Sequence, residues 1–524
     1  MTYVITQSCA ADTSCVVACP VNCIHPAPGE PGFAEAEMLH IDANTCVGCG
    51  ACVTACPAGA IEVATTVSPA QARFQELSAA YYESFPHAGR SPVALIAPDR
   101  PLLQGAPARV AIVGAGPAGL YMADELLRRR EVSDVDVFDR MRTPHGLLRF
   151  GVSPDHGRTK NFARLFESIE RERGFRYLLG VEVGKVVSLD ELRSHYDAVV
   201  VAVGASADRR LGIPGENLVG SIAATHLVGW YNGHPEHQLL DVPLDHERAV
   251  VIGNGNVALD VARILTSDPE LLTQTDLAPE PLEQMRRSRV REVVILGRRG
   301  PADASFTVPE LIGLSELSGV DVIVDPSEIP PDAGNVKVRL LGELAARGAD
   351  PSPTRPRIVL RFATTPIEIL GSDRVTGVRV EAKDRTETID AGLVVRAIGS
   401  EALTMPGLPV DPRTGTVPNE GGRVEPGLYV VGWIKRGATG LIGTNKTCAK
   451  QTADRLLEDF KTAVPRAASR GGEIAAFLQA RVPDAFGLEG WHRLNAEEQA
   501  RGRAAGRPRM KIVDPEEQAA VALS

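Results

Sequence analysis

Residues 109–126 have the sequence Arg109-Val-Ala-Ile-Val-Gly114-Ala-Gly116-Pro-Ala-Gly119-Leu-Tyr-Met-Ala-Asp-Glu-Leu, and this stretch decides the fold of most of the chain. An apolar run, a G-x-G-x-x-G turn and an amphipathic run predict a strand, a tight turn and a helix. The glycines allow the turn, the approach of the backbone to a pyrophosphate and the packing of the helix on the strand. The next predicted strand ends in Asp139, where a carboxylate can bind a ribose hydroxyl. The stretch therefore predicts a dinucleotide-binding domain.

A second copy of this motif has the turn Gly253-Asn254-Gly255-Asn256-Val257-Ala258. This copy lacks an acid equivalent to Asp139. Its following predicted strand, 293–297, is instead followed by Arg298 and Arg299. Two guanidinium groups would bind a 2′-phosphate, which a carboxylate would repel. The second site is therefore predicted to prefer NADP over NAD.

Two similar segments, 198–205 and 393–400, each have the pattern of a buried strand that ends in a small-residue turn. Two dinucleotide sites in one chain indicate two different dinucleotides that exchange electrons, and the usual order along a chain is FAD and then NADP. We therefore interpret the two segments as the crossovers that join an FAD domain to an NADP domain inserted within it. The FAD domain resumes near Gly427 to Trp433, and the glycine-rich segment Gly437 to Gly443 precedes a helix whose positive end could face the flavin. The predicted fold class is an α/β flavoprotein with two Rossmann-like domains, preceded by a small α+β ferredoxin-like domain.

Eight of the nine cysteines lie in the first 60 residues, in two runs that contain Cys-Pro. The second run, Cys46-x2-Cys49-x2-Cys52-x3-Cys56-Pro57, has the spacing with which bacterial ferredoxins hold iron–sulfur clusters. In that arrangement the last cysteine of one run binds the cluster of the other run. One 4Fe-4S cluster is therefore predicted on four thiolates: Cys19, Cys46, Cys49 and Cys52.

The first run, Cys9-x2-Asp12-x2-Cys15-x3-Cys19-Pro20, has an aspartate in place of the second thiolate. Cys9, Cys15 and Cys56 remain as predicted ligands of the other cluster. That cluster is either a 3Fe-4S cluster with this corner empty, or a 4Fe-4S cluster with an oxygen of Asp12 as the fourth ligand; the sequence leaves both open. Cys23 is expected to be buried without binding iron.

Disulfides and zinc fit these cysteines less well. The start of the chain lacks the basic and apolar segments of a secretion signal, which disfavours disulfides. Three cysteines at x2, x2 spacing before Cys-Pro do not form the paired knuckles of a zinc site. The cysteine usage fits a reducing cytoplasm, and no uninterrupted apolar run of about 18 residues predicts a membrane span.

The charge of the chain is unevenly distributed. Of the net charge of −10, residues 1–66 carry six carboxylates and no Lys or Arg. Such an acidic module can dock on a basic surface, or its charge can serve solubility alone. The candidate basic patches are Arg128 to Arg130, Arg286 with Arg287, and Arg501 to Lys511. Nucleic-acid binding is not expected from this acidic balance.

Residues from about 107 to the C-terminus resemble adrenodoxin-reductase-type ferredoxin–NADP reductases, and the N-terminus resembles seven-iron or eight-iron bacterial ferredoxins. The motifs that carry the resemblance are Gly146-Leu-Leu-Arg-Phe-Gly-Val-Ser-Pro-Asp-His156, Gly253 to Arg263, Gly297-Arg-Arg-Gly-Pro301 with Glu310, and Gly432-Trp-Ile-Lys-Arg-Gly437. The chain departs from the reductase pattern one turn after Glu310, where the family often has an acid and this chain has Gly313.

The resemblance implies the residues of both nucleotide sites. Beside the turn residues Gly114, Gly116 and Gly119, the implied FAD contacts are Ala118, Asp139, Leu147, Val183, Trp433, Gly440, Leu441 and Ile442. Beside Gly253 and Gly255, the implied NADP contacts are Asn254, Asn256, Val257, Arg298, Arg299, Glu310 and Gly440. His156 matches a family position near the flavin, with either a proton-transfer or orienting role or a structural hydrogen bond.

The implied activity is that of an NADPH–ferredoxin oxidoreductase. Electrons would pass from NADPH to FAD and then singly to the clusters of the chain's own ferredoxin-like domain, to an external ferredoxin, or to both. The alternative is the electron-input subunit of a larger redox complex, similar to the small subunit of glutamate synthase. A disulfide reductase is disfavoured because Cys448 is the only cysteine outside the module. A cluster-based sensor would be a third, non-enzymatic class.

These motifs divide the chain into five predicted segments. A ferredoxin-like domain at 1–66 is followed by a proline-rich linker at 67–106, in which 70–82 could form a short helix. The FAD domain occupies 107–212 and, with a C-terminal tail, 397–524, while the NADP domain occupies 213–396.

Overall fold

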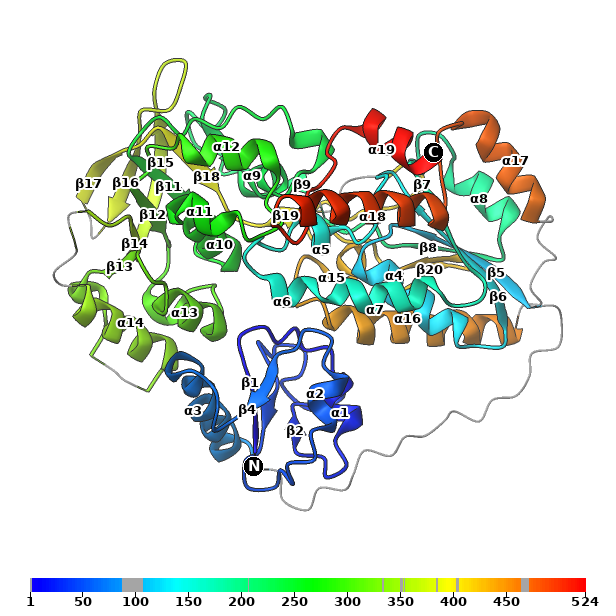
Figure 1. Cartoon of the computed structure of the whole chain (residues 1–524), viewed down its shortest axis with the longest axis horizontal. Helices are drawn as coiled ribbons and strands as arrows, with labels where there is room; N and C mark the ends of the chain where they lie inside the picture. Colours follow the sequence, from blue (N-terminus) through cyan, green and yellow to red (C-terminus); the bar gives the residue numbers. More distant parts are fainter. Residues whose placement is uncertain are drawn as a thin grey trace.

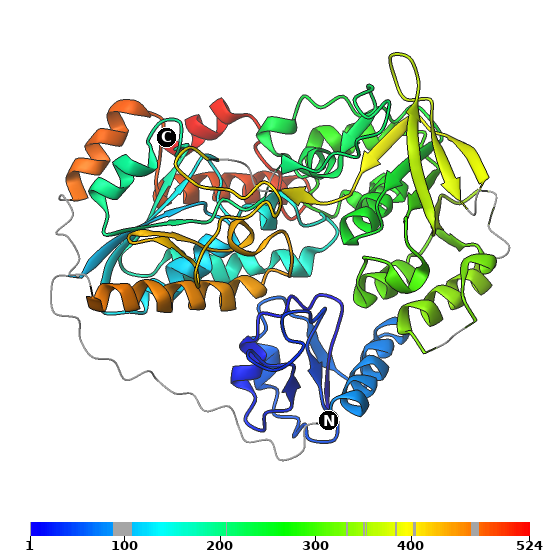
Figure 2. The same cartoon turned by 180° about the vertical axis from the view of Figure 1, so that it is seen from behind.

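The computed structural model describes residues 2–86, 107–205, 207–331, 334–348, 352, 354–382, 385–401, 405–462 and 471–524. These residues form a small N-terminal module and two larger lobes (Figure 1). The module lies beneath the two lobes near the place where they meet, and the view from behind shows the same arrangement (Figure 2). The predicted fold class is confirmed, because two Rossmann-like lobes follow a small α+β module.

The N-terminal module consists of two similar halves that surround the cysteine runs. Strand β1 (Tyr3–Ile5) pairs antiparallel with β4 (Ile61–Val63), which joins the two ends of the module. Between them lie α1 (Ser14–Ala18), β2 (Ile24–His25), β3 (His40–Ile41) and α2 (Ala51–Ala55). Thr13 and Gly50, both with positive φ, precede the two short helices, and an extended cysteine before a proline ends each of them. The same turn therefore recurs in each half.

Helix α3 (Pro69–Ser84) follows the module and confirms the helix predicted at 70–82. The Ser68 hydroxyl accepts a hydrogen bond from the N–H of Gln71 at 3.3 Å, and proline occupies the first helical position. The helix contacts β1 and β3, and its Phe74 is fully buried, so α3 packs as part of the module. The remainder of the predicted linker, 87–106, lies outside the described residues.

The first lobe is built on a six-stranded sheet. Its strands are β5 (Ala108–Val113), β6 (Val132–Asp139), β7 (Phe175–Leu179), β8 (Ala198–Val201), β20 (Arg423–Glu425) and β21 (Leu428–Val430), in the order β20-β21-β8-β5-β6-β7. All neighbours are parallel except β20 and β21. The central strands are almost fully buried, as expected for a parallel sheet covered by helices such as α4 (Pro117–Leu127) and α16 (Thr444–Thr462).

The second lobe is built on another six-stranded sheet, in which every pairing is parallel. Its strands, in spatial order, are β10 (Ser221–Ala223), β18 (Leu393–Arg396), β11 (Arg248–Ile252), β12 (Glu292–Leu296), β14 (Arg357–Arg361) and β13 (Asp321–Val324). An antiparallel sheet of β15 (Thr364–Leu370), β16 (Gly377–Ala382) and β17 (Arg385–Asp390) lies beside it. The main helices are α9 (Ala224–Tyr231), α10 (Asn256–Thr266), α13 (Val308–Ser315) and α14 (Val336–Arg347).

Two crossovers connect the lobes, as predicted. The chain leaves the first sheet after β8 and returns to it at β21, which pairs with β8. The crossing segments meet, because β9 (Ala207–Asp208) pairs antiparallel with β19 (Ser400–Glu401). The second lobe is therefore an insertion held by two adjacent connections.

The remaining described helices are α5 (Leu147–Phe150), α6 (Gly157–Lys160), α7 (Phe162–Glu170), α8 (Leu189–His195), α11 (Pro269–Leu272), α12 (Pro279–Arg286), α15 (Trp433–Arg436), α17 (Gly471–Arg481), α18 (Leu488–Ala504) and α19 (Pro515–Leu523), with 3-10 turns at Pro235–His237, Pro301–Asp303 and Pro326–Glu328. Within the described ranges, none of the helices has the length and apolar character needed to cross a bilayer.

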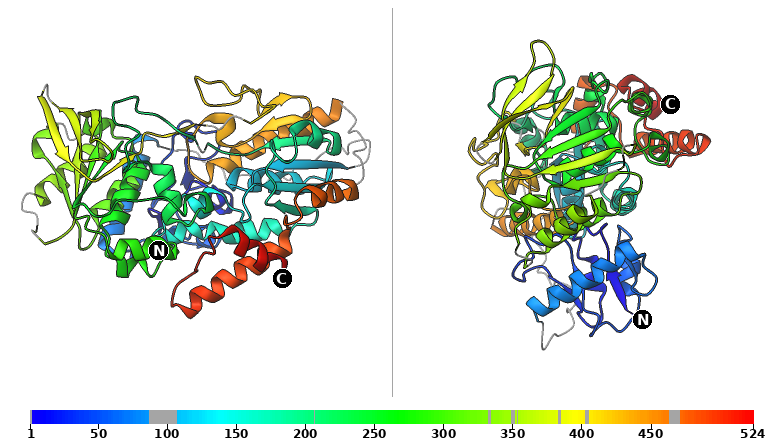
Figure 3. Two further views of the ribbon diagram at one scale, coloured as in Figure 1. Left: turned by 90° about the horizontal axis from the view of Figure 1, so that it is seen from above. Right: turned by 90° about the vertical axis from the view of Figure 1, so that its left-hand side faces the viewer.

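The C-terminal helices α18 and α19 pack on the outer side of the first lobe (Figure 3). Glu498 of α18 has no solvent exposure, and its carboxylate lies 2.5 Å from Arg149 and 2.7 Å from Arg509. It also accepts a hydrogen bond from the N–H of Ile512 at 3.0 Å. The buried carboxylate of Glu498 therefore helps to bind the C-terminal tail to the lobe, together with Lys511, which donates to the Arg149 carbonyl at 3.3 Å.

We expect Glu498→Ala to destabilise the first lobe by about 3–5 kcal/mol, because it leaves two largely buried guanidinium groups without their counter-charge. Thermal unfolding followed by circular dichroism would measure the change. Glu497→Ala, which removes the exposed partner of Arg501 on the same helix, serves as control and should cost less than about 1 kcal/mol. Equal losses in the two variants would contradict the role of the buried carboxylate.

Candidate functional site

The structure brings together the four cysteines predicted to bind one cluster. Cys19, Cys46, Cys49 and Cys52 line one small pocket of the module. Burial, followed by the neighbouring thiols of Cys46, Cys19 and Cys49, raises the pKa of Cys52 to about 11. The loop between these cysteines bends at Gly48 and Gly50, which have φ of 68° and 77°.

The second predicted set, Cys9, Cys15 and Cys56, also gathers. Burial raises the pKa of Cys9 to about 11, with a further contribution from Cys56. Burial and then the Cys9 and Cys56 thiols raise the pKa of Cys15 well above its ordinary value. Clustered buried thiolates need cations to balance their charge, and the irons of a cluster supply that balance. Both cysteine sets therefore fit iron–sulfur clusters.

Cys23 is buried, as expected, but it lies closer to the predicted ligands than the sequence suggested. Its Sγ is 3.4 Å from Sγ of Cys19, and its N–H donates to the same sulfur at 3.4 Å. Cys23 also lines the pocket of the four predicted ligands. That it binds no iron remains a prediction.

The carboxylate of Asp12, the possible fourth ligand, contacts the first lobe. Its Oδ2 accepts a hydrogen bond from the Tyr121 hydroxyl at 3.0 Å and lies 3.7 Å from Nζ of Lys446. Its Oδ1 accepts from the N–H of Ser14 at 3.2 Å. Asp12 is only 6% exposed, so both oxygens are engaged in a nearly closed environment.

The residues predicted to bind FAD surround the turn after β5. Gly114 has φ of 115°, and a Cβ there would lie 2.6 Å from the Ala202 carbonyl oxygen, while a Cβ at Gly119 would clash with the Gly114 carbonyl. Asp139 ends β6 and accepts from the N–H of Ala115 at 2.7 Å and of Met141 at 2.8 Å. Burial raises the pKa of Asp139, and its carboxylate retains free lone pairs for a ribose.

The other predicted FAD contacts come from four segments. Ala118 and Val183 are buried, whereas Leu147 is 48% exposed although it is apolar. Trp433 is half-buried and donates from Nε1 to the Thr439 carbonyl at 3.0 Å. Gly440 is exposed, and Leu441 and Ile442 are half-buried before α16. Three of these features fit a bound dinucleotide. They are the crowded glycine turn at Gly114, the exposed apolar side chain of Leu147 and the acid Asp139 at the strand end.

The predicted NADP residues lie at the equivalent turn of the second lobe. Gly253 has φ of 112°, and a Cβ there would clash with the Ala397 carbonyl, as at the first turn. Asn254 and Asn256 accept hydrogen bonds from the N–H groups of Ser305 and Thr307, which fix the loop to the start of α13. Gly255 has open space around its Cα, and Val257 is 46% exposed.

Arg298 and Arg299 follow β12 and are both exposed. Arg299 donates to the Ser305 hydroxyl at 3.3 Å. Among the described side chains, no carboxylate forms an ion pair with either guanidinium, so both remain available to a phosphate. This pair fits the 2′-phosphate of NADP.

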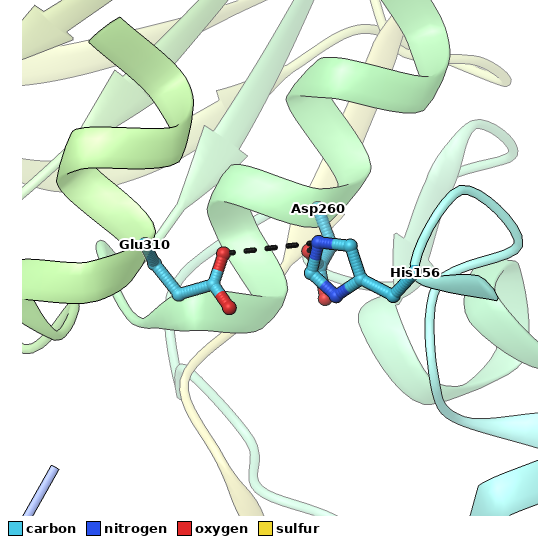
Figure 4. Close-up of side chains that lie close together, drawn as sticks. All are labelled: His156, Asp260 and Glu310. Atoms are coloured by element: carbon cyan, nitrogen blue, oxygen red, sulfur yellow. Dashed lines mark ion pairs between the residues drawn. The ribbon is translucent and has the colours of Figure 1, made fainter. Parts of the chain in front are cut away.

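A polar cluster occupies the junction of the two lobes (Figure 4). His156 comes from the first lobe, whereas Asp260 and Glu310 come from α10 and α13 of the second, with Nε2 of His156 3.9 Å from each carboxylate. Arg263 is central to the cluster, because its Nη2 lies 2.7 Å from Nε2 of His156 and 2.6 Å from Oδ1 of Asp260. It also pairs with Asp155.

These contacts set the electrostatics of the cluster. Arginine only donates, so Nε2 of His156 accepts the hydrogen bond from Arg263. Burial alone would raise the pKa of Asp155, but the guanidinium of Arg263 outweighs it and lowers the pKa to about 2. Burial raises the pKa of Glu310, the carboxylate of Asp260 adds to the shift, and Arg263 opposes it. His156, Asp260 and Glu310 are metal-ligand types, but a guanidinium already supplies the positive charge between them.

All three parts of the chain meet at this cluster. Nε2 of Gln7, from the module, donates to Oε2 of Glu310 at 3.3 Å. A cavity of about 480 Å³ opens beside it, lined by residues of the module and of both lobes, including Gln7, Glu62, His156, Arg158 and Glu310. The sequence indicated His156 and Glu310 but not Arg263, Asp155 or Gln7, although Arg263 and Asp155 lie inside motifs quoted for the resemblance.

Comparison with known proteins agrees with this arrangement. The pyridine nucleotide-disulphide oxidoreductase family matches residues 108–295, and the 4Fe-4S binding domain matches residues 39–62. A probable ferredoxin/ferredoxin–NADP reductase of Mycobacterium bovis is 47% identical over all of this chain and 95% of its own length. NADPH-ferredoxin reductase FprA of Mycobacterium tuberculosis is 44% identical over 78% of this chain and 97% of its own.

Two further matches extend the comparison. The mitochondrial NADPH:adrenodoxin oxidoreductase of Mus musculus is 39% identical over 78% of this chain and 90% of its own. The structure of Mycobacterium tuberculosis FprA in complex with NADPH superposes with a TM-score of 0.77 at 41% identity, over 80% of this chain and all of that one.

We expect Asp155→Asn to lower the midpoint of thermal unfolding by about 3–6 °C near neutral pH. The folded-state pKa of Asp155, about 2, lies below its unfolded value, so the Arg263 pair stabilises the fold above the unfolded pKa and loses this contribution as the pH falls toward 2. The difference between variant and wild type should therefore shrink at about pH 3. Asp241→Asn, at an exposed carboxylate, is the control. A difference that stays constant with pH would refute the pairing.

Proposed function

Since the chain belongs to the ferredoxin/ferredoxin–NADP reductase family, we propose that it oxidises NADPH and delivers the electrons to iron–sulfur clusters of its own module, to an external ferredoxin, or to both. The observation that carries this proposal is the meeting of Gln7, His156 and Glu310, one residue from each part of the chain. A nicotinamide, a flavin and a cluster module could approach one another at that junction.

The finer assignment of cofactors is part of the proposal. Cys19, Cys46, Cys49 and Cys52 would hold a 4Fe-4S cluster, and Cys9, Cys15 and Cys56 a second cluster of three or four irons. FAD would bind at the turn after β5 and NADP at the turn after β11. The domain boundaries at 106, 212 and 396 are proposed on the same basis, whereas the boundary predicted at 66 moves to the end of α3, which packs on the module. A cytoplasmic location, which suits thiolate-held clusters, is also proposed.

The groups of the chain position and shield the cofactors. When bound, FAD accepts a hydride from NADPH and releases electrons singly, which suits one-electron clusters. The N-termini of α4 and α10 would hold the two pyrophosphates, and Arg298 with Arg299 would select the 2′-phosphate. Arg263 orients His156 through the hydrogen bond that Nη2 donates to Nε2. Glu310, whose pKa is raised, is the carboxyl group of the junction that most readily keeps a proton.

Reduction of the purified holoprotein by NADPH under anaerobic conditions tests this function. We expect the flavin absorbance to bleach and a cluster EPR signal to change within the same titration. A protein whose flavin is reduced while neither its clusters nor an added ferredoxin accept electrons would contradict the proposal. Copurification with a second polypeptide that receives the electrons would favour the alternative of an input subunit.

We expect Arg298→Ala to raise the KM for NADPH about 10- to 100-fold, since it removes a charge-assisted phosphate contact. The KM for NADH, which lacks the 2′-phosphate, should stay within about twofold. Steady-state dye reduction with each nucleotide measures both values. Arg287→Ala, at another exposed arginine of the second lobe, is the matched control. Equal increases for NADPH and NADH would exclude the phosphate role of Arg298.

A further inference from the structure

We propose that Asp12 is a docking anchor rather than an iron ligand: it binds Tyr121 and Lys446 and so fixes the loop of the first cysteine run against the FAD lobe. This inference rests on the proposed function, because it assigns the route by which electrons leave that lobe. The partner surface is within the chain, on helices α4 and α16.

The contacts of Asp12 join the module to the first lobe in one compact group. Tyr121 is 1% exposed and donates its hydroxyl to Asp12 at 3.0 Å. Lys446 lies 3.7 Å from the same carboxylate and donates to the Ser14 hydroxyl at 3.0 Å. A carboxylate that leaves both groups would strand a buried hydroxyl and an ammonium, so the docked arrangement satisfies all three.

Gly443 shows that the lobe is shaped for this loop. Its N–H donates to the Ala10 carbonyl at 2.9 Å. A Cβ at Gly443 would clash with backbone atoms of Ala10, Ala11 and Asp12. Its φ lies outside the range that favours glycine, so the neighbouring loop is the reason for a small residue here. Gly443 directly follows the predicted FAD contacts Gly440 to Ile442.

Gln7 gives the module a further contact, with the second lobe. Its amide donates to Glu310 at 3.3 Å. The same amide lies against Gly313, but as the end of a flexible side chain it can shift, so this contact fixes the module less firmly than the backbone contacts at Gly443. Gln7 therefore adds to the Asp12 anchor.

Further charge pairs join the module to the lobes at the rim, and one of them, Arg73 of α3 with Glu343 of α14, places the cation on the module. The acids of the module, Glu37 and Glu62, pair with Lys337 and Arg158 of the two lobes. These pairs are partly exposed and contribute little each, whereas the Asp12 contact is buried and sets the orientation. Acids of the module therefore do contact cations of the lobes, but these cations, Lys337, Arg158 and Lys446, lie far apart in the sequence and form no basic patch.

The predicted basic patches are not these cations. Arg128 and Arg129 pair with Asp124 and Asp454 of their own lobe, and Arg286 pairs with Glu270. In the tail, Arg501 pairs with Glu497 and Glu517, and Lys511 with Asp276.

The anchor also selects which cluster faces the flavin. The module contacts the first lobe through Ala10, Asp12 and Ser14, which lie between Cys9 and Cys15, and through Gly59, which follows Cys56. In the described part of the chain, the run from Cys46 to Cys52 makes no hydrogen bond or ion pair with either lobe. A cluster held by Cys9, Cys15 and Cys56 would therefore be the first acceptor of electrons from the FAD lobe, and it would take the two electrons of each NADPH one at a time.

Three variants of the full-length holoprotein test the anchor: Asp12→Asn, Tyr121→Phe and Lys446→Met. We expect cluster reduction after mixing with NADPH, followed by stopped-flow, to slow by about tenfold or more, because a small displacement of a docked donor–acceptor pair has a large effect on rate. NADPH-dependent dye reduction, iron content and the EPR signal of the oxidised protein should match wild type. Lys450→Met, one turn along α16 at a lysine paired within its own helix, is the control.

Hydrogen exchange gives a readout that does not depend on activity. The amide of Gly443, which donates to Ala10, should exchange faster in the three variants than in wild type or Lys450→Met. An altered iron content or EPR signal in Asp12→Asn, with no change in Tyr121→Phe, would overturn the anchor and make Asp12 a ligand. Rates and exchange equal to those of Lys450→Met would also overturn it. If wild type fails to reduce dye with NADPH, the proposed function fails, and the exchange experiment still decides the docking.

Discussion

The two glycine turns that are proposed to bind the nucleotides both depend on a carbonyl group that follows a crossover strand. Gly114 lies against the carbonyl of Ala202 after β8, and Gly253 lies against that of Ala397 after β18. Only glycine fits, because φ is positive and a Cβ would meet the carbonyl. The crossovers themselves pair as β9 and β19. The two turns are therefore held at fixed positions relative to each other, which is the condition for direct transfer between two bound dinucleotides.

The junction between the lobes solves an electrostatic problem. Three carboxylates, Asp155, Asp260 and Glu310, approach one another in a partly buried region, where unpaired charge is costly. Arg263 compensates Asp155 and Asp260 at close range but lies 3.9 Å from Glu310. Burial raises the pKa of both groups, but Arg263 outweighs burial at Asp155, whose pKa is about 2, and does not outweigh it at Glu310, whose pKa stays raised. Such a divergence separates a fixed charge from a group able to exchange a proton.

Local patterns predicted the fold and the grouping of the candidate cysteines, because glycine turns, strand ends and cysteine spacing encode local geometry. The grouping of Cys9 with Cys56 and the return of the chain at β21 followed from those patterns. The orientation of Asp12 did not, since its partners are more than 100 residues away in the sequence. The docking cations were missed for the same reason: local charge density indicated Arg128 to Arg130, but the fold pairs two of these three with acids nearby.

Because the module is covalently linked to the two lobes, a modest polar interface is enough to keep it docked. A tethered domain binds at the effective concentration set by its linker, so a few hydrogen bonds and one buried anchor can keep it docked. A separate ferredoxin would have to supply its full association free energy from contacts alone. The docked module also covers the surface around Gly443 and Glu310, so an external acceptor must either receive electrons from the exposed side of the module, where Cys49 lies, or displace it. The first route keeps the anchor intact and uses both cysteine sets in sequence.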